Sequence, residues 1–200
     1  METTMTNQSN PKLYKLPVSG REAGFSLLEV LIAGAVITVG LLAILGLFGT
    51  ALAATQSSQL DEIAHARATQ TLESVYTARQ TAQLGWDSIN NVGTITNGTN
   101  GIFTVGMVPM TDPGPDGLDG TTDDVAVAPF VLPGPDGILG TSDDQTIALT
   151  GFQRQIQITS AVANGAPIPT LKQVIVTVQY PSNKGTLRTY TVQALVSEYR

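Results

Sequence analysis

The 200-residue sequence contains no cysteine, one histidine and one tryptophan, and it is poor in basic residues. Without cysteine, a disulfide, a thiolate nucleophile and a cysteine-bound zinc are all excluded. Ten lysines and arginines stand against sixteen aspartates and glutamates, which gives a net charge of -6. A nucleic-acid-binding surface carries a basic patch, and the sequence shows none, so we expect no nucleic-acid partner. It also shows no Ser/His/Asp set, nucleotide-binding loop or paired-acid cleft, so we expect no enzymatic activity.

Against this acidic background, the sequence contains one long apolar run between Gly24 and Ala54. From Val30 to Ala54 it carries no charge, and only Thr38 and Thr50 are polar. A membrane-spanning helix needs about 20 mostly apolar residues. The run is therefore long enough to cross a membrane.

Glu29 is the one charged residue in this run. A charge inside a spanning helix costs roughly 2.5 to 3.5 kcal/mol on insertion scales, so an acid there suggests a function. The nearest arginines are Arg21 and Arg67, both distant along the chain. Cleavage of the peptide bond after Gly24 would create a cation much nearer, the α-amino group of Phe25.

The segment Gly24-Phe25-Ser26-Leu27-Leu28-Glu29-Val30-Leu31-Ile32-Ala33 resembles the processing site of type IV prepilins. The resemblance implies cleavage between Gly24 and Phe25 by the membrane-embedded prepilin peptidase, N-methylation of Phe25, and pairing of Glu29 with the N-terminus of a neighbouring subunit. It extends over the predicted N-terminal helix, from Phe25 to Leu84, and is greatest to PilV-type minor pilins and the minor pseudopilins of type II secretion. The implied partners are other pilin subunits, the inner membrane, the peptidase and the assembly platform.

Two other interpretations of the apolar run remain open. It could be a secretory signal peptide cut after Ala53, although the apolar region of such a peptide is much shorter than this run. It could also be a plain single-pass anchor. Basic residues precede the run and acids follow it, which predicts that the N-terminus lies in the cytoplasm and the head across the membrane. The resemblance to type IV prepilins implies that the head lies in the periplasm. The residues that set this orientation are Lys12, Lys15, Arg21, Asp61 and Glu62.

The chain divides into four predicted segments. Residues 1–24 form a polar leader, 25–54 the transmembrane or filament-core half of a long helix, 55–85 its amphipathic half, and 86–200 a β-rich head. Removal of the leader would leave seven basic and fourteen acidic residues, a net charge of -7. Gly85 is expected to end the helix, and the sole histidine, His65, is expected to face solvent. The amphipathic half of the helix has helical periodicity. Its apolar positions are Leu60, Ile63, Ala64, Val75, Ala78 and Leu84, and Leu72 and Tyr76 lie on the adjacent face.

Beyond Trp86 the pattern changes to strands. We predict strands at 101–108, 146–161, 172–180 and 186–196, with a turn at 181–185 between the last two. The last two alternate apolar and polar residues, which is typical of half-buried antiparallel strands. The predicted fold class is therefore α+β and pilin-like: a long helix, hydrophobic and then amphipathic, packed on a C-terminal antiparallel sheet.

An acidic motif occurs twice, at 112–124 (DPGPDGLDGTTDD) and at 132–144 (LPGPDGILGTSDD). Clustered carboxylates with glycine turns suit Ca²⁺, which takes about 6 to 8 oxygen ligands, although neither copy has the EF-hand spacing. The alternative is ordinary Pro-Asp-Gly turn chemistry in exposed, soluble loops. The first copy is the stronger candidate because it has Asp119 where the second has Leu139. The candidate ligands are Asp116, Asp119, Asp123, Asp124, Asp136, Asp143 and Asp144.

The function that these observations favour is structural. We expect a minor subunit of a type IV pilus or a related filament, held in the inner membrane by a single span before assembly. A minor pseudopilin of a type II secretion system is the alternative within the family. A membrane-anchored, calcium-dependent adhesive or binding module is the alternative from another class.

Overall fold

The computed structural model describes residues 24–182 and 185–199. The predicted leader, apart from Gly24, lies outside these residues. The chain divides into two compact units, residues 1–47 and residues 48–200. One helix, α1 (Leu27–Gln80, 54 residues), begins in the first unit and ends in the second.

In the first unit, α1 exposes its large apolar side chains. Those of Leu27, Leu31, Val36 and Leu45, for example, are between 62% and 79% exposed. Within the described residues, α1 is the one helix long and apolar enough to cross a membrane. The predicted membrane-spanning segment is therefore present as a helix, although it begins at Leu27 and not at Phe25.

The helix ends at Gln80, earlier than the predicted end near Leu84. Ala82 adopts a left-handed backbone conformation with φ 64°, which a helix cannot continue through. The amide of Leu84 then donates to the carbonyl of Ala78 (2.9 Å), so the chain folds back and Leu84 is still buried. The apolar periodicity predicted which residues are buried better than it predicted where the helix stops.

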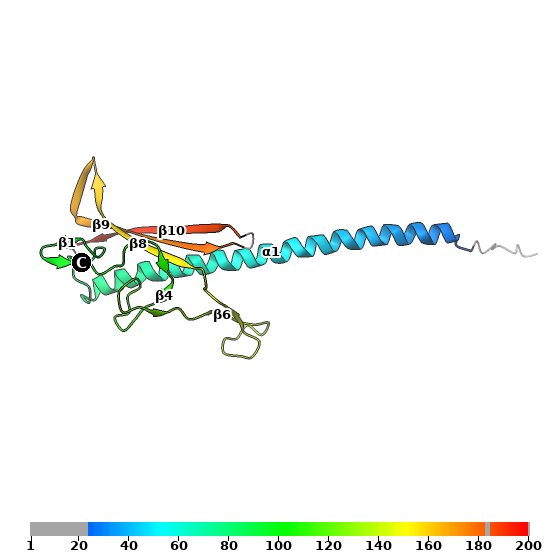
Figure 1. Cartoon of the computed structure of the whole chain (residues 1–200), viewed down its shortest axis with the longest axis horizontal. Coiled ribbons are helices and arrows are strands. Elements are labelled where there is room, and N and C mark those ends of the chain that lie inside the picture. Colours follow the sequence, from blue (N-terminus) through cyan, green and yellow to red (C-terminus); the bar gives the residue numbers. More distant parts are fainter. Residues whose placement is uncertain (1–23, 183–184, 200) are drawn as a thin grey trace, which may run out of the picture. The chain divides into compact units, whose positions relative to one another are not determined.

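The head contains an antiparallel four-stranded sheet with the order β10-β9-β8-β3. Figure 1 labels β8, β9 and β10 of this sheet. Its strands are β3 (Val108–Pro109), β8 (Gln153–Ala163), β9 (Ala166–Pro181) and β10 (Leu187–Ser197). Asn164 and Gly165, both with positive φ, form the two-residue turn between β8 and β9, as expected for an Asn-Gly hairpin. This turn carries β8 and β9 beyond the predicted strand ends at residues 161 and 172. Of the predicted turn at 181–185, residues 183 and 184 lie outside the described part.

Three two-stranded hairpins complete the strands of the described residues. They pair β1 (Ile95–Thr96) with β2 (Thr99–Asn100), β4 (Thr111–Asp112) with β5 (Val125–Ala126), and β6 (Phe130–Leu132) with β7 (Gln145–Ile147). Two predictions were wrong here. Most of 101–108 is irregular, since Phe103 makes only an isolated bridge to Asn91. The predicted strand at 146–161 is interrupted between β7 and β8 by a turn at Gly151.

The core lies between the second part of α1 and one face of the sheet. The stripe predicted for the helix is confirmed, because its apolar residues are buried or pack against the core. The alternation predicted for β9 is also confirmed, with every second side chain from Val174 to Tyr180 buried. The core members from these two elements are Ile63, Ala64, Ala68, Leu72, Val75, Ala78, Val174, Val176, Val178 and Tyr180.

A buried lysine joins the segment after α1 to the sheet. The ammonium of Lys172, on β9, donates to the carbonyls of Trp86 (2.8 Å) and Ile89 (2.9 Å). The same nitrogen lies 4.5 Å from the centroid of the Trp86 ring, within cation–π range. Burial lowers the pKa of Lys172 below its ordinary value, and nearby acids only partly oppose this shift. The residue therefore replaces lost hydration with two carbonyls and an aromatic face.

Replacing Lys172 with Met should destabilise the head. The variant keeps the apolar stem but leaves two carbonyls without their donor, which costs about 1 to 3 kcal/mol in unfolding free energy. Trp86 is the sole tryptophan, so its fluorescence reports both the lost contact and the thermal unfolding. Gln173→Met, one residue along on the opposite face of β9, is the control and should leave both signals unchanged. Equal stability of the Lys172→Met variant and the wild type would contradict the role given to this lysine.

Candidate functional site

The start of α1 positions Glu29 in the first helical turn. The Ser26 hydroxyl accepts the N–H of Leu28 (3.3 Å), and the Ser26 carbonyl accepts the N–H of Glu29 (2.9 Å). Ser26 is thus the N-cap, and Glu29 stands three residues later, the spacing of a capping box. A carboxylate there is also favoured by the partial positive charge of the helix N-terminus. Capping and the helix dipole thus stabilise an acid at this position, independently of any other role of Glu29.

The predicted processing residues surround this cap. Phe25 is 82% exposed, and a side chain added at Gly24 would meet no atom within 4 Å. Glu29 is also exposed, and no further charge follows it along the chain before Asp61. The structure thus leaves both the expected cleavage point and the carboxylate accessible to another protein.

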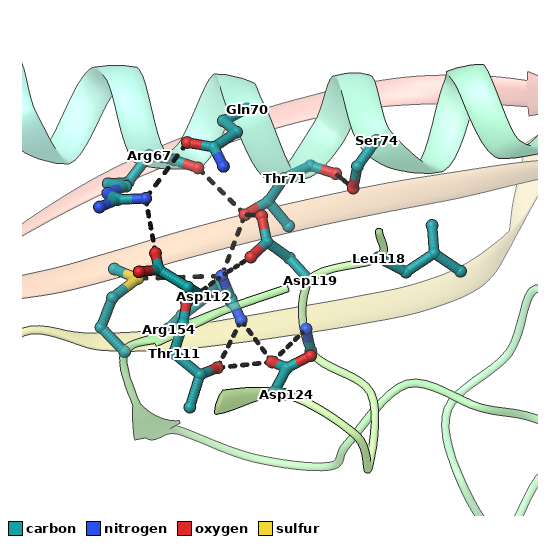
Figure 2. A network of polar contacts seen from close by, with 12 residues as sticks. Arg67, Gln70, Thr71, Ser74, Thr111, Asp112, Leu118, Asp119, Asp124 and Arg154 are labelled. Atoms are coloured by element: carbon teal, nitrogen blue, oxygen red, sulfur yellow. Dashed lines mark hydrogen bonds and ion pairs between the residues drawn. The ribbon is translucent and has the colours of Figure 1, made fainter. Parts of the chain in front are cut away.

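In the head, the first acidic hairpin is fixed by a buried arginine that comes from β8. The guanidinium of Arg154 is 1% exposed and forms ion pairs with Asp119 (2.7 Å) and Asp124 (3.0 Å). The hydroxyl of Thr71, on α1, donates to Asp119 (2.8 Å), and Arg154 donates to that same hydroxyl (3.3 Å). Thr111, in β4, accepts from Arg154 and donates to Asp124. Figure 2 shows this network connecting the helix, the sheet and the hairpin.

A second, more exposed ion pair lies beside it. Arg67, on α1, contacts Asp112 (2.9 Å), whose other carboxylate oxygen accepts the N–H of Ala128 (2.7 Å). Leu118, in the tip of the hairpin, is 4% exposed and belongs to the core. The first acidic hairpin is therefore docked on the helix by charge on one side and by an apolar side chain on the other.

Three acids of the first hairpin, including Asp124, surround one hydroxyl. Thr121 Oγ1 lies 2.6 Å from Asp123, 3.2 Å from Asp116 and 3.2 Å from Asp124. The hydrogen bond from Thr121 is the main cause that lowers the pKa of Asp123, and burial opposes it. Because a hydroxyl has one proton to donate, it can satisfy only one of the three carboxylates at a time.

The second hairpin repeats the turn without the docking. Thr141 lowers the pKa of Asp143 as Thr121 lowers that of Asp123, and Asp136 accepts the N–H of Ile138 as Asp116 accepts that of Leu118. The positions of Asp112 and Asp119 are Leu132 and Leu139 here, and Leu139 is 62% exposed. Asp144 accepts the N–H of Gly140 (2.6 Å), while its other oxygen is buried without a hydrogen-bond partner. Among the residues that the structure describes, no arginine forms an ion pair with this hairpin.

The glycines of the two motifs have a clear structural role. A side-chain carbon at Gly114 would lie 2.2 Å from the carbonyl oxygen of Asp123, and one at Gly134 would lie 2.3 Å from that of Asp143. Such close approach of two backbone segments admits only glycine. The first glycine of each repeated Pro-Gly-Pro-Asp-Gly sequence is thus explained by the turn itself.

The seven candidate calcium ligands therefore have partners of several kinds. Asp119, which made the first hairpin the stronger candidate, is bound by Arg154, a cation supplied by the chain. Among the residues that the structure describes, no group of three or more His, Cys, Asp or Glu side chains is placed to hold a metal ion. Calcium binding by these loops stays a prediction.

Two residues central to this arrangement were not singled out from the sequence. Ser26 could have been found, since Ser26-Leu27-Leu28-Glu29 is a capping-box pattern. Arg154 could not, because an arginine in an alternating strand normally marks a solvent-facing position. His65 is exposed as predicted, and its ring packs edge-on against Tyr190 with centroids 5.0 Å apart.

Comparison of the chain with models of protein families, with curated proteins and with solved structures finds no match. The structure establishes only the general fold class: an α+β protein with one long apolar N-terminal helix and a C-terminal antiparallel sheet. The helix is compatible with single-pass membrane anchoring. The residues that bear on the function of the protein are those at the start of the helix and those of the head.

The two hairpins provide a matched pair of variants for the buried network. Asp124→Asn should lower the unfolding free energy by about 3 kcal/mol, because it removes one partner of a buried arginine. Asp144→Asn changes the same position of the repeat, where no arginine is present, and should cost less than about 1 kcal/mol. Thermal and denaturant unfolding followed by Trp86 fluorescence would measure both. Equal effects of the two variants would contradict the docking role of Arg154.

Proposed function

We propose that this protein is a structural subunit of a type IV pilus or a related filament, made as a precursor that is cut after Gly24. The observation that carries the proposal is the position of Glu29. Glu29 lies in the first turn of a 54-residue helix, shortly after the small residue Gly24 and the exposed Phe25. An uncharged stretch follows it and continues to Leu60. A hydrocarbon layer makes a lone carboxylate costly, and the amine released at Phe25 would offset that cost.

The proposed mechanism of assembly follows from this charge. In the membrane, the N-terminus would lie on the cytoplasmic side and the head in the periplasm. When a subunit joins a filament, Glu29 of one copy would pair with the methylated N-terminus of Phe25 of its neighbour. Only one axial position of two parallel helices brings these groups together. The pair would thus set the register of the filament core.

The apolar half of α1 supports this role. Its glycines at 34, 40, 46 and 49 have open space around the position of a side chain, so the subunit alone does not require them. Small residues allow helices to approach closely in an apolar environment. Helix packing between copies would use that space. The alternative explanation, to which we give equal weight, is that glycine is generally frequent in spanning helices.

A filament role is structural, so we propose no enzymatic activity for this chain. The partners would be other pilin subunits, the prepilin peptidase and the assembly platform. Within the family, a minor pilin and a minor pseudopilin of type II secretion share the features described. The α+β head would form the exposed surface of either filament.

The mature N-terminus is the most direct test of processing. Co-expression of the full chain with a prepilin peptidase should yield a protein that begins at Phe25 and carries one added methyl group, as seen by mass spectrometry. Gly24→Lys should abolish this product, while Gly20→Lys, a glycine before the proposed site, should not. A mature chain beginning near residue 54 would instead identify a secretory signal peptide, and an uncut chain would identify a plain anchor.

Glu29→Ala should separate processing from assembly. We expect normal cleavage but at least about tenfold less incorporation into filaments, since loss of a charge-assisted contact in an apolar site costs over about 1.4 kcal/mol. Glu29→Gln should behave in the same way, because it keeps the size and loses the charge. Glu62→Ala removes an exposed acid further along α1 and serves as the control. Full incorporation of Glu29→Ala would remove the argument from charge pairing.

A further inference from the structure

A groove in the head lies where the apolar part of α1 ends. It has a volume of about 570 Å³. One wall is helical, with Thr50, Ala54 and Ser57, and the other comes from the end of β9 and the start of β10, with Ser182, Thr186 and Arg188. The groove therefore combines the alanine side chains of the helix with hydroxyl groups and one guanidinium.

An ion pair holds the arginine of this groove in place. Arg188 donates through Nη1 to both oxygens of Asp61 (2.6 and 2.7 Å) and to the hydroxyl of Ser57 (2.9 Å). Asp61 also accepts from the hydroxyl of Tyr180 (2.9 Å), which is buried in the core. The side chains of Arg188 and Asp61 are nevertheless 45% and 40% exposed. A fixed cation and a fixed anion are thus presented to solvent next to each other.

The groove lies at a defined level of the helix. Thr50 and Ala54 belong to the last turns of the apolar run, and Ser57 follows three residues later, about 4.5 Å along the helix axis. The apolar run from Val30 to Ala54 extends over roughly 37 Å, while the hydrocarbon layer is about 30 Å thick and the headgroup layers add about 5 to 7 Å on each side. In an anchored subunit, the groove would therefore lie at the depth of the lipid headgroups.

The charges of the groove select among headgroups. Arginine and hydroxyl groups together suit a phosphate, since the planar guanidinium fits its oxygens. Asp61 does not line the groove, but its ion pair with Arg188 places a half-exposed carboxylate beside it, an acceptor suited to a primary ammonium. An ion pair without net charge, on an acidic protein, matches a headgroup that itself carries both charges and disfavours one that is only anionic.

We propose that this groove binds the headgroup of a phospholipid that carries an ammonium, such as phosphatidylethanolamine, while the subunit is anchored in the membrane. Arg188 and the hydroxyls bind the phosphodiester, and Asp61 accepts from the ammonium. The contact holds the head against the membrane surface and has to break when the subunit leaves the bilayer. It rests on the anchoring in the proposed function, but not on cleavage or on filament formation.

The test measures lipid binding to the full-length chain in detergent by native mass spectrometry. The probes are phosphatidylethanolamine, phosphatidylglycerol, the water-soluble glycerophosphoethanolamine and inorganic phosphate. We expect the wild type to prefer phosphatidylethanolamine to phosphatidylglycerol. Arg188→Gln should weaken binding of both lipids about tenfold, as expected for a charge-assisted contact. Unchanged binding by this variant would overturn the proposal.

Asp61→Asn gives a result that simple damage to the fold would not produce. It removes the acceptor for the ammonium and leaves Arg188 in place, so the preference should shift toward phosphatidylglycerol. An unchanged preference would overturn the assignment of Asp61. Glu62→Gln changes the neighbouring exposed acid, which makes no ion pair with Arg188 in the described structure, and this control should behave like the wild type.

Two further measurements separate the sources of the phosphate and guard against misfolding. Displacement of the lipid by inorganic phosphate at similar concentrations would identify a free-anion site and overturn the lipid assignment. Trp86 fluorescence reports whether each variant is folded, and Arg188→Lys keeps the charge if Arg188→Gln is unstable. Arg188→Lys should retain part of the binding, because the ammonium contacts the phosphate without the paired geometry of arginine. A failure here would leave the mature N-terminus and the Glu29 results unaffected, so the two proposals can fail separately.

Discussion

The buried guanidinium of Arg154 is the interaction on which the arrangement of the head depends. Burying two carboxylates and an arginine costs several kcal/mol per ion before any contact is made. The cost is offset only because α1 and the first hairpin provide charge and hydrogen bonds, through Thr71, Thr111, Asp119 and Asp124. The position of the first hairpin relative to α1 and the sheet is therefore specified by electrostatics as well as by apolar packing.

The second hairpin shows what the same turn becomes without that arginine. Its glycines and its Asp143 repeat the local geometry, so the turn itself does not require docking. Leu139 replaces Asp119, and the apolar tip of the hairpin is exposed, whereas Leu118 in the first copy is buried. The second copy thus lacks two acids, with Leu132 and Leu139 at the positions of Asp112 and Asp119, and it lacks the arginine that the first copy contacts.

This contrast explains how far the sequence predicted the structure. Periodicity predicted the buried faces of α1 and β9 because it depends only on the local repeat of a helical turn and on the alternation of a strand. It missed the end of α1, which is decided by the left-handed Ala82, and the irregular path of 101–108, which is fixed by contacts with distant residues such as Asn91. The ion pairs of Arg154 join β8 to acids that lie far earlier in the chain, in the first hairpin. No local pattern contains that information.

The small number of positive charges limits how copies of the chain can bind one another. Every lysine and arginine in the described part already has a partner within the chain: Arg67 with Asp112, Arg79 with backbone carbonyls, Arg154 with Asp119 and Asp124, Lys172 with carbonyls, and Arg188 with Asp61. Contacts between described surfaces of two acidic heads would therefore bring like charges together. The attraction between copies would therefore come from the apolar helix, where Glu29 has no arginine or lysine nearby in sequence. Cleavage after Gly24 would then supply a cation that is not already engaged, which makes processing the step that prepares the subunit for assembly.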